Sequence, residues 1–249
     1  MLNPITIQYV IRPKRRSLLS GQVSDLFGLS ATEPPHVIAD NVVLEVRPGD
    51  LVLFTGPSGS GKSSLMRAVS EQVNAVDAAA MVLPEVPLIE GMNGTLQERL
   101  NTLAACGLSE ARLLLRTPSE LSDGQRYRFR IAYALAQATP QSFIMLDEFT
   151  AMLDRTLAKV VAFNLRKLVT KSHIGVLAAT THEDIIDDLN PDLHLQCHGE
   201  GVIDKQRRAV KKKNSASPMM SGCPRGPSPI GRTSLGGITA AITSPSPAV

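Results

Sequence analysis

The sequence predicts an α/β fold whose central sheet is largely parallel and flanked by helices. Three short apolar runs, residues 51–55, 143–146 and 174–180, alternate with stretches of helical periodicity. This alternation is typical of parallel strands, because each connecting helix returns the chain to the same edge of the sheet. Polar or glycine-rich segments follow all three runs, so we expect them together at the carboxyl edge, where such sheets bind ligands.

The segment after the first run matches the P-loop pattern G-x-x-x-x-G-K-[ST] at every fixed position. Its glycines allow backbone N–H groups to surround a polyphosphate, Lys62 can neutralise the β- and γ-phosphates, and the Ser63 hydroxyl can ligate Mg²⁺. A chance Gly/Ser loop is not expected between a strand and a helix, so we predict nucleoside triphosphate binding. The predicted contacts are Gly56, Pro57, Ser58, Gly59, Ser60, Gly61, Lys62, Ser63 and Ser64.

The motifs that follow resemble those of the ATP-binding-cassette (ABC) ATPases in kind and in order. Residues 121–125, Leu-Ser-Asp-Gly-Gln, resemble the LSGGQ signature of that family and precede a basic helical stretch. Residues 143–146 with Asp147 and Glu148 resemble its Walker B motif. The signature segment alone would be weak support, because five small or polar residues recur by chance.

Two further motifs complete the resemblance. Residues 151–154, Ala-Met-Leu-Asp, look like the D-loop, and Thr181-His182 looks like the switch histidine after the last core strand. The five motifs stand in the family's order within residues 36–200, which leaves little room for Ras-like, kinase-like or AAA+ ATPases. The resemblance implies a P-loop NTPase fold of ABC type, with a short antiparallel β part and a helical subdomain.

Roles for the catalytic candidates follow from their positions and from the resemblance. Asp147 ends an apolar strand, where its carboxylate can hold Mg²⁺ through water and accept a hydrogen bond from Ser63. Glu148 is expected to orient or deprotonate the attacking water, with a helix-capping acid as the alternative. His182 is expected to contact the γ-phosphate, with a purely structural histidine as the alternative. Lys62, Glu148 and His182 form the predicted catalytic set.

The signature and the D-loop imply a second subunit. In the family the signature binds a phosphate of the other subunit's ATP, so the expected active unit is a homodimer with two nucleotides at its interface. Asp123 stands where the signature usually carries glycine, and its charge would weaken cross-subunit activation unless it simply faces solvent. The residues expected to contact the nucleotide from these motifs are Ser122, Gly124, Gln125 and Asp154.

Several features depart from the family. The span between Lys62 and Leu121 is shorter than in transporter ATPases, so we expect a reduced helical subdomain built from two short amphipathic helices. Glu85 stands where the Q-loop carries glutamine, and its carboxylate is a further candidate ligand for Mg²⁺. Phe149 follows the Walker B acids, where proline or alanine is commoner.

An aromatic residue to stack on adenine is not obvious. Tyr9, Phe27 and His36 are the candidates, and an ordinary packing role is the preferred interpretation of each. The chain divides into three expected regions. These are an N-terminal strand with a basic irregular segment (1–35), the ABC-type ATPase domain (36–204), and a Ser/Pro/Gly-rich tail (205–249) that is expected to be disordered.

Charge is distributed unevenly between these regions. The chain has 26 Lys and Arg against 23 Asp and Glu, but the tail from Lys205 onward contains no acidic residue. Such a tail can hold nucleic acid or acidic lipid. The preferred alternative is a solvated linker, or a non-native reading frame that follows a truncation.

Composition excludes two other classes of protein. The longest apolar runs are shorter than the roughly 20 residues of a membrane span, and the N-terminus lacks a signal-peptide pattern. The three cysteines are too scattered for a disulfide framework or a zinc site. We therefore expect a cytoplasmic protein, with any transmembrane partner supplied by a separate chain.

The predicted function is Mg²⁺-dependent ATP binding and hydrolysis by a soluble ABC-type ATPase acting as a nucleotide-driven dimer. One alternative is the ATP-binding subunit of a membrane ABC transporter. Another is a weakly hydrolysing ATP-binding switch, against which the presence of Glu148 and His182 argues. Residues 147–150 and 180–184 also look like ABC-type ATPases similar to those with an acetyltransferase-like C-terminal domain, a domain that this chain would then have lost.

Overall fold

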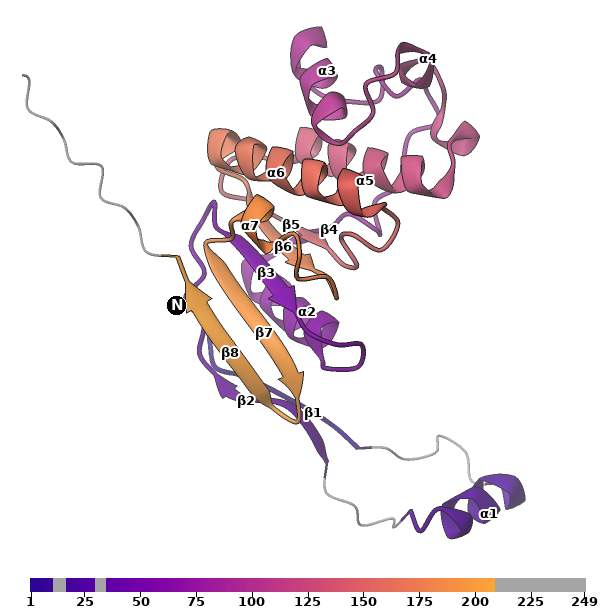
Figure 1. The fold of residues 1–249 in the computed structure, drawn as a ribbon, viewed down its shortest axis with the longest axis vertical. Helices are drawn as coiled ribbons and strands as arrows, with labels where there is room; N and C mark the ends of the chain where they lie inside the picture. The colour runs from indigo at the N-terminus through magenta and orange to yellow at the C-terminus, as the bar shows by residue number, and fades with distance from the viewer. Residues whose placement is uncertain (11–16, 30–34, 209–249) are drawn as a thin grey trace, which may run out of the picture. The chain divides into compact units, whose positions relative to one another are not determined.

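A computed structural model describes residues 1–10, 17–29 and 35–208 (Figure 1). Its main sheet contains six strands in the order β4-β5-β6-β3-β7-β8, which confirms the predicted α/β fold. All neighbours are parallel except β7 and β8, which form an antiparallel hairpin. The strands are β3 (Leu51–Thr55), β4 (Val76–Asp77), β5 (Phe143–Leu146), β6 (Gly175–Ala179), β7 (Leu193–Gly199) and β8 (Val202–Arg207).

Helices cover both faces of this sheet, as the ribbon shows (Figure 1). Alternate residues of β3 point to opposite faces, so Leu51 and Leu53 belong to one core cluster and Val52 and Phe54 to another. The first cluster includes side chains of α3, α5 and α6, and the second includes those of α2. The helices are α2 (Lys62–Val73), α3 (Leu96–Ala105), α4 (Ala111–Leu114), α5 (Asp123–Gln137), α6 (Arg155–Ser172), α7 (Ile186–Leu189) and the 3₁₀ turn η1 (Pro118–Glu120).

A short antiparallel ribbon of β1 (Ile5–Tyr9) and β2 (His36–Val42) packs on the α2 side of the sheet. The N-terminal strand therefore pairs directly with the first strand of the ATPase region. The segment 17–35 was expected to be irregular, and this was wrong for α1 (Leu18–Leu26). Ser17 caps that helix in a reciprocal capping box, while none of its nine residues is buried, so local hydrogen bonding and not core packing selects it.

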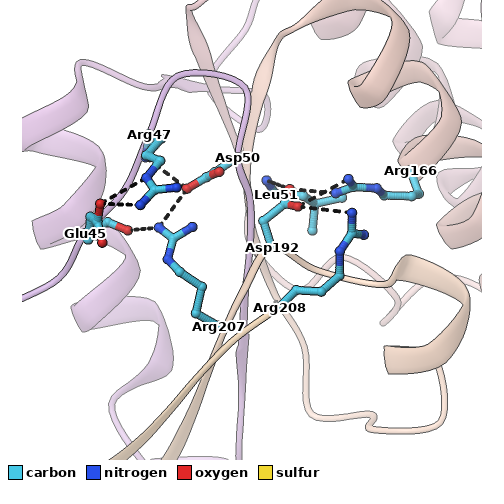
Figure 2. Close-up of polar contacts among 8 residues, drawn as sticks. All are labelled: Glu45, Arg47, Asp50, Leu51, Arg166, Asp192, Arg207 and Arg208. Carbon is cyan, nitrogen blue, oxygen red and sulfur yellow. Dashed lines mark hydrogen bonds and ion pairs between the residues drawn. The ribbon is translucent and has the colours of Figure 1, made fainter. Parts of the chain in front are cut away.

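The expected start of a disordered tail at residue 205 was also wrong for its first residues. Lys205 and Arg207 lie in β8, and the Arg207 guanidinium donates to the Asp50 carboxylate at 3.0 Å. Asp50 also accepts from the backbone N–H of Arg47 at 2.9 Å, and Arg207 donates to the carbonyl of Glu45 (Figure 2). These contacts fix β8 at the amino end of β3. The rest of the tail lies outside the described residues.

A second carboxylate, Asp192, occupies the same end of the sheet (Figure 2). It accepts from the backbone N–H of Leu51 at 2.9 Å and from Arg166 of α6 at 2.6 and 3.2 Å. Arg208 approaches its other side at 3.8 Å. Because Asp192 and Arg166 are each less than a fifth exposed, this pair joins α6, β7 and the central strand through largely desolvated charges.

Candidate functional site

The loop after β3 adopts a conformation that only glycine tolerates at two positions. Gly56 has φ 138°, and a Cβ there would lie 2.0 Å from the Cys197 carbonyl oxygen. Gly61 has φ 90°, and its Cβ would lie 2.2 Å from a methyl carbon of Ile38. The loop is thus wedged between β7 and β2, which holds its backbone in a fixed curve before α2 begins at Lys62.

Lys62 and Ser60 face the interior of this loop. The Lys62 ammonium donates to the Pro57 carbonyl at 2.7 Å, although the side chain is buried and has no carboxylate partner within the described residues. The Ser60 hydroxyl is buried and has no hydrogen-bond partner in the described part of the chain. A buried hydroxyl without a partner is costly, so this atom indicates a place for a polar ligand.

The carboxylates that follow β5 lie against the start of α2. The Ser63 hydroxyl donates to Asp147 at 2.9 Å, and Arg67 approaches the other Asp147 oxygen at 3.6 Å. Glu148 has φ 52°, a left-handed conformation, and its backbone N–H donates to the Asp147 carboxylate at 3.0 Å. The exposed Glu148 side chain is therefore turned out of the strand direction by a local, hydrogen-bonded bend.

Tyr127 of α5 contacts the backbone of the bend at Asp147 and Glu148. Its hydroxyl donates to the Asp147 carbonyl at 3.5 Å. Burial raises the pKa of Tyr127, and the nearby charges of Asp147 and Glu148 raise it further. The phenol therefore stays protonated and acts only as a hydrogen-bond partner.

A pocket of about 340 Å³ gathers the ends of β3, β5 and β6 with the start of α2. It brings together the candidates Lys62, Ser63, Asp147, Glu148 and His182 from three separate parts of the sequence. Five other residues of its wall were not among the predicted site residues, namely Ile38, Ala151, Ala179, Thr180 and Thr181. The full lining is Ile38, Ser58, Gly59, Gly61, Lys62, Ser63, Ser64, Asp147, Glu148, Ala151, Ala179, Thr180, Thr181 and His182.

His182 is held by two threonine hydroxyls that the sequence did not identify. Its Nδ1 lies 3.0 Å from the Thr150 hydroxyl, and its backbone N–H donates to the Thr180 hydroxyl at 3.1 Å. The two hydroxyls are 2.6 Å apart. Their positions next to the Walker B acids and the switch histidine are the only sequence signal that could have found them.

The predicted nucleotide contacts of the signature and the D-loop, Ser122, Gly124, Gln125 and Asp154, do not line this pocket, although the D-loop residue Ala151 does. Ser122 and Gln125 instead form a reciprocal capping box at the start of α5, with hydrogen bonds of 3.1 and 3.3 Å. Asp154 caps α6 by accepting from the N–H of Leu157 at 2.9 Å. Gly124 lies beside the Met152 carbonyl oxygen, 3.1 Å from where a Cβ would stand.

Two expectations near the pocket have different outcomes. Glu85, a candidate metal ligand, is not among the pocket residues, and its carboxylate accepts from the Ser119 hydroxyl at 2.8 Å. Tyr9, for which a packing role was preferred, is half-exposed and donates to the hydroxyl of the pocket residue Ser64 at 3.1 Å. An aromatic ring from β1 therefore reaches the pocket wall through a contact that sequence spacing could not predict.

Comparisons with known proteins identify the family. The family model described as "ATPase family associated with various cellular activities (AAA)" matches residues 52–197, more than half of the chain. The chain is 28% identical over 202 residues to the lipoprotein-releasing system ATP-binding protein LolD of Novosphingobium aromaticivorans, covering 66% of this chain and 88% of that protein.

A second relative and a solved structure agree with this result. The aliphatic sulfonates import ATP-binding protein SsuB 3 of Paraburkholderia xenovorans is 31% identical over 176 residues, covering 63% of this chain and 70% of that protein. A dimeric ATP-binding cassette in a post-hydrolysis state, bound to ADP and Pi, superimposes with a TM-score of 0.55 at 20% identity, covering 83% and 97% of the two chains.

The match to the family model includes the P-loop and the Walker B strand. The two relatives are ATP-binding proteins, and the solved structure is an ATP-binding cassette. The chain therefore belongs to the ABC family of P-loop ATPases, and its enzymatic activity is ATP hydrolysis.

Proposed function

We propose that this ATPase works as a dimer of two copies that closes around two ATP molecules. The observation that carries the proposal is the separation between the pocket and the start of α5. The pocket contains Lys62, Asp147 and His182, whereas Ser122 and Gly124 lie outside it. In this proposal a triphosphate in the pocket is covered by its own chain and by the α5 N-terminus of a second copy, whose N–H groups suit its negative charge.

Within this proposal Mg²⁺ is held by Ser63 and Asp147. Their oxygens are 2.9 Å apart at the pocket wall, and oxygen donors are the ligands that Mg²⁺ prefers. Mg²⁺ usually takes only one or two protein ligands beside phosphates and water, so a third carboxylate is not needed. The Glu85 carboxylate accepts a hydrogen bond from Ser119 and is not part of this proposed metal site. When bound, the ion would neutralise negative charge on the phosphates.

Lys62, Glu148 and His182 of the pocket each have one task in hydrolysis. Lys62 supplies a positive charge beside the phosphate-binding amides, and the exposed carboxylate of Glu148 orients the attacking water. His182 donates a hydrogen bond to the γ-phosphate. Tyr9, at the wall beside Ser64, is the candidate to contact the adenine ring. Positioning and electrostatics supply the catalysis, because phosphoryl transfer needs little covalent chemistry from the protein.

A second part of the proposal concerns what hydrolysis drives. The relatives are named as ATP-binding proteins of lipoprotein-releasing and sulfonate-import systems, so we extend membrane coupling from them to this chain. Within the described ranges, no helix is long and apolar enough to cross a membrane. The names of these relatives mention no nucleic acid, so the proposal does not include a nucleic-acid partner.

An exposed apolar surface supports this coupling. Val82 and Leu115 are 88% and 72% exposed, and Val86 is also exposed. The segment that follows Val86 lies along the end of α4, since the N–H of Leu88 donates to the Arg116 carbonyl at 3.0 Å. This surface is a suitable place for a helix of a membrane-embedded partner on the cytoplasmic side.

The test measures ATP hydrolysis by the purified protein and by Glu148→Gln, with size-exclusion chromatography in the presence and absence of ATP and Mg²⁺. We expect hydrolysis to fall about 100-fold or more in the variant, as for loss of a catalytic group, while ATP traps the variant as a dimer. Glu200→Gln is the matched control, because Glu200 also has a left-handed backbone but lies in the β7–β8 turn. A variant that binds ATP and stays monomeric at every concentration would overturn the dimer proposal.

A further inference from the structure

Three hydrogen bonds connect the ends of β5 and β6 behind His182. The His182 N–H donates to the Thr180 hydroxyl, the Thr180 and Thr150 hydroxyls are 2.6 Å apart, and Thr150 lies 3.0 Å from His182 Nδ1. Thr150 and Thr180 are 1% and 3% exposed, so water does not compete for these groups. The arrangement closes a small ring that begins and ends at the same histidine.

The backbone around this ring is equally fixed. The Thr180 N–H donates to the Phe54 carbonyl at 3.0 Å, and the Phe149 N–H donates to the Ala179 carbonyl at 2.8 Å. These bonds hold the segment after β5 and the segment after β6 against the central strand. The two hydroxyl oxygens are thus set in place by main-chain contacts, and ordering them costs little additional side-chain entropy.

Counting donors determines the direction of the hydrogen bonds between the hydroxyls. Each threonine hydroxyl has one proton to donate. The Thr180 oxygen already accepts from the His182 N–H, and the Thr150 oxygen is its partner within the described residues, so Thr180 donates to Thr150. Thr150 then donates its own proton to His182 Nδ1. The reverse direction would leave the Thr180 proton buried without an acceptor in the described part of the chain, which is unfavourable.

This direction has a consequence for the imidazole. In a neutral histidine one ring nitrogen accepts and the other carries the proton. We propose that Thr150 and Thr180 are positioning residues that fix His182 as the tautomer with its proton on Nε2. The ring then presents an N–H donor to the pocket, which it needs in order to bind a phosphate oxygen. The effect on hydrolysis rests on the role of His182 in the proposed function, whereas the tautomer itself does not.

The first test observes the tautomer directly in the whole chain by ¹⁵N NMR of labelled histidine. We expect the wild-type spectrum to show His182 with an unprotonated Nδ1 and a protonated Nε2. Thr150→Val removes the one hydroxyl among the described residues that contacts Nδ1 and should produce a mixture of tautomers, while Thr150→Ser should restore the wild-type signal. Thr55→Val is the matched control, because its buried hydroxyl bonds a different histidine, His194, at 2.8 Å.

The second test measures hydrolysis. We expect Thr150→Val to lower kcat about 10- to 100-fold with a smaller change in KM, as for other partners that orient a functional histidine. Thr180→Val should cost less, because Thr150 keeps its own proton for Nδ1. An unchanged His182 tautomer in Thr150→Val would overturn the inference. Wild-type hydrolysis in His182→Ala would instead overturn the proposed role of His182, whatever the spectrum shows.

Discussion

The two ends of the central strand β3 carry charge in opposite ways. At the amino end, Asp50 and Asp192 each accept hydrogen bonds from an arginine and from a backbone N–H. At the carboxyl end, Lys62 and Glu148 have no oppositely charged side chain as partner within the described residues, and Lys62 is buried. The strand therefore begins beside carboxylates that are paired within the chain and ends beside two charges that have no such partner in the described residues.

The difference shows which charges serve the fold and which serve the ligand. A desolvated charge is tolerated only when a partner offsets its lost hydration, and the amino-end network supplies such partners within the chain. At the carboxyl end we propose that the partner is a phosphate or a metal ion from outside the chain. Variants at the two ends should therefore separate stability from activity, and the following predictions begin with the largest expected effect.

Lys62→Ala should abolish activity while sparing the fold. Loss of a positioned charge that stabilises a phosphoryl group costs on the order of 100- to 1000-fold in kcat. The free energy of unfolding should change little, because within the described ranges the ammonium has only the Pro57 carbonyl as partner. Steady-state hydrolysis and urea unfolding measure the two quantities. A large loss of stability together with full activity would reverse the proposed division between the two ends.

Asp192→Ala should have the opposite profile. It leaves Arg166 largely buried without its carboxylate and the Leu51 N–H without an acceptor. Breaking such a pair costs about 3–5 kcal/mol of unfolding free energy. Urea unfolding measures this loss. Asp204→Ala is the control, since the Asp204 carboxylate is 64% exposed and pairs with the exposed His198.

Arg207→Ala should destabilise less than the loss of Asp192. Asp50 keeps its hydrogen bond from the Arg47 N–H, so the carboxylate is not left without a partner. The variant removes the charged hydrogen bonds of Arg207 to Asp50 and to the Glu45 carbonyl, and losses of this kind cost about 1–3 kcal/mol. Hydrogen exchange should show faster opening of β8 than of β3 in this variant. Equal opening of both strands would mean that Arg207 holds the whole sheet and not only its edge.

The buried hydrogen-bonded pair of His194 and Thr55 should make the free energy of unfolding depend on pH. Burial lowers the pKa of His194, whose Nε2 lies 2.8 Å from the Thr55 hydroxyl, while Glu183 partly opposes the shift. The unfolded chain then takes up the proton first as the pH falls. The stabilising contribution is therefore complete above the ordinary histidine pKa of about 6.5 and is lost as the pH falls through the lower folded value.

The measurement compares unfolding free energies above and below that range for the wild type and for His194→Gln. The variant should lose part of the decrease seen on acidification, whereas His198→Gln, an exposed control, should keep it. An identical pH dependence in all three proteins would exclude a role for His194.

Much of the site could be predicted because its motifs are local. The P-loop, the Walker B acids and the switch histidine are each set by a strand and the few residues after it, so parallel pairing had to bring them to one edge. The helix α1 was not predicted because none of its side chains is buried, and its one local signal is the capping box at Ser17 and Ser20. Glu85 and Tyr9 were placed by side-chain contacts with residues 34 and 55 positions away.

The sequence by itself determined the fold class, the phosphate loop and the pair of acids after β5, since each is written in consecutive residues. Only the tertiary structure decided which hydroxyls surround His182 and which arginines neutralise Asp50 and Asp192. Thr150 and Thr180 are 30 positions apart, and Asp50 and Arg207 are 157 apart. Such contacts leave no periodic pattern, because the sheet order and not the spacing along the chain brings their side chains together.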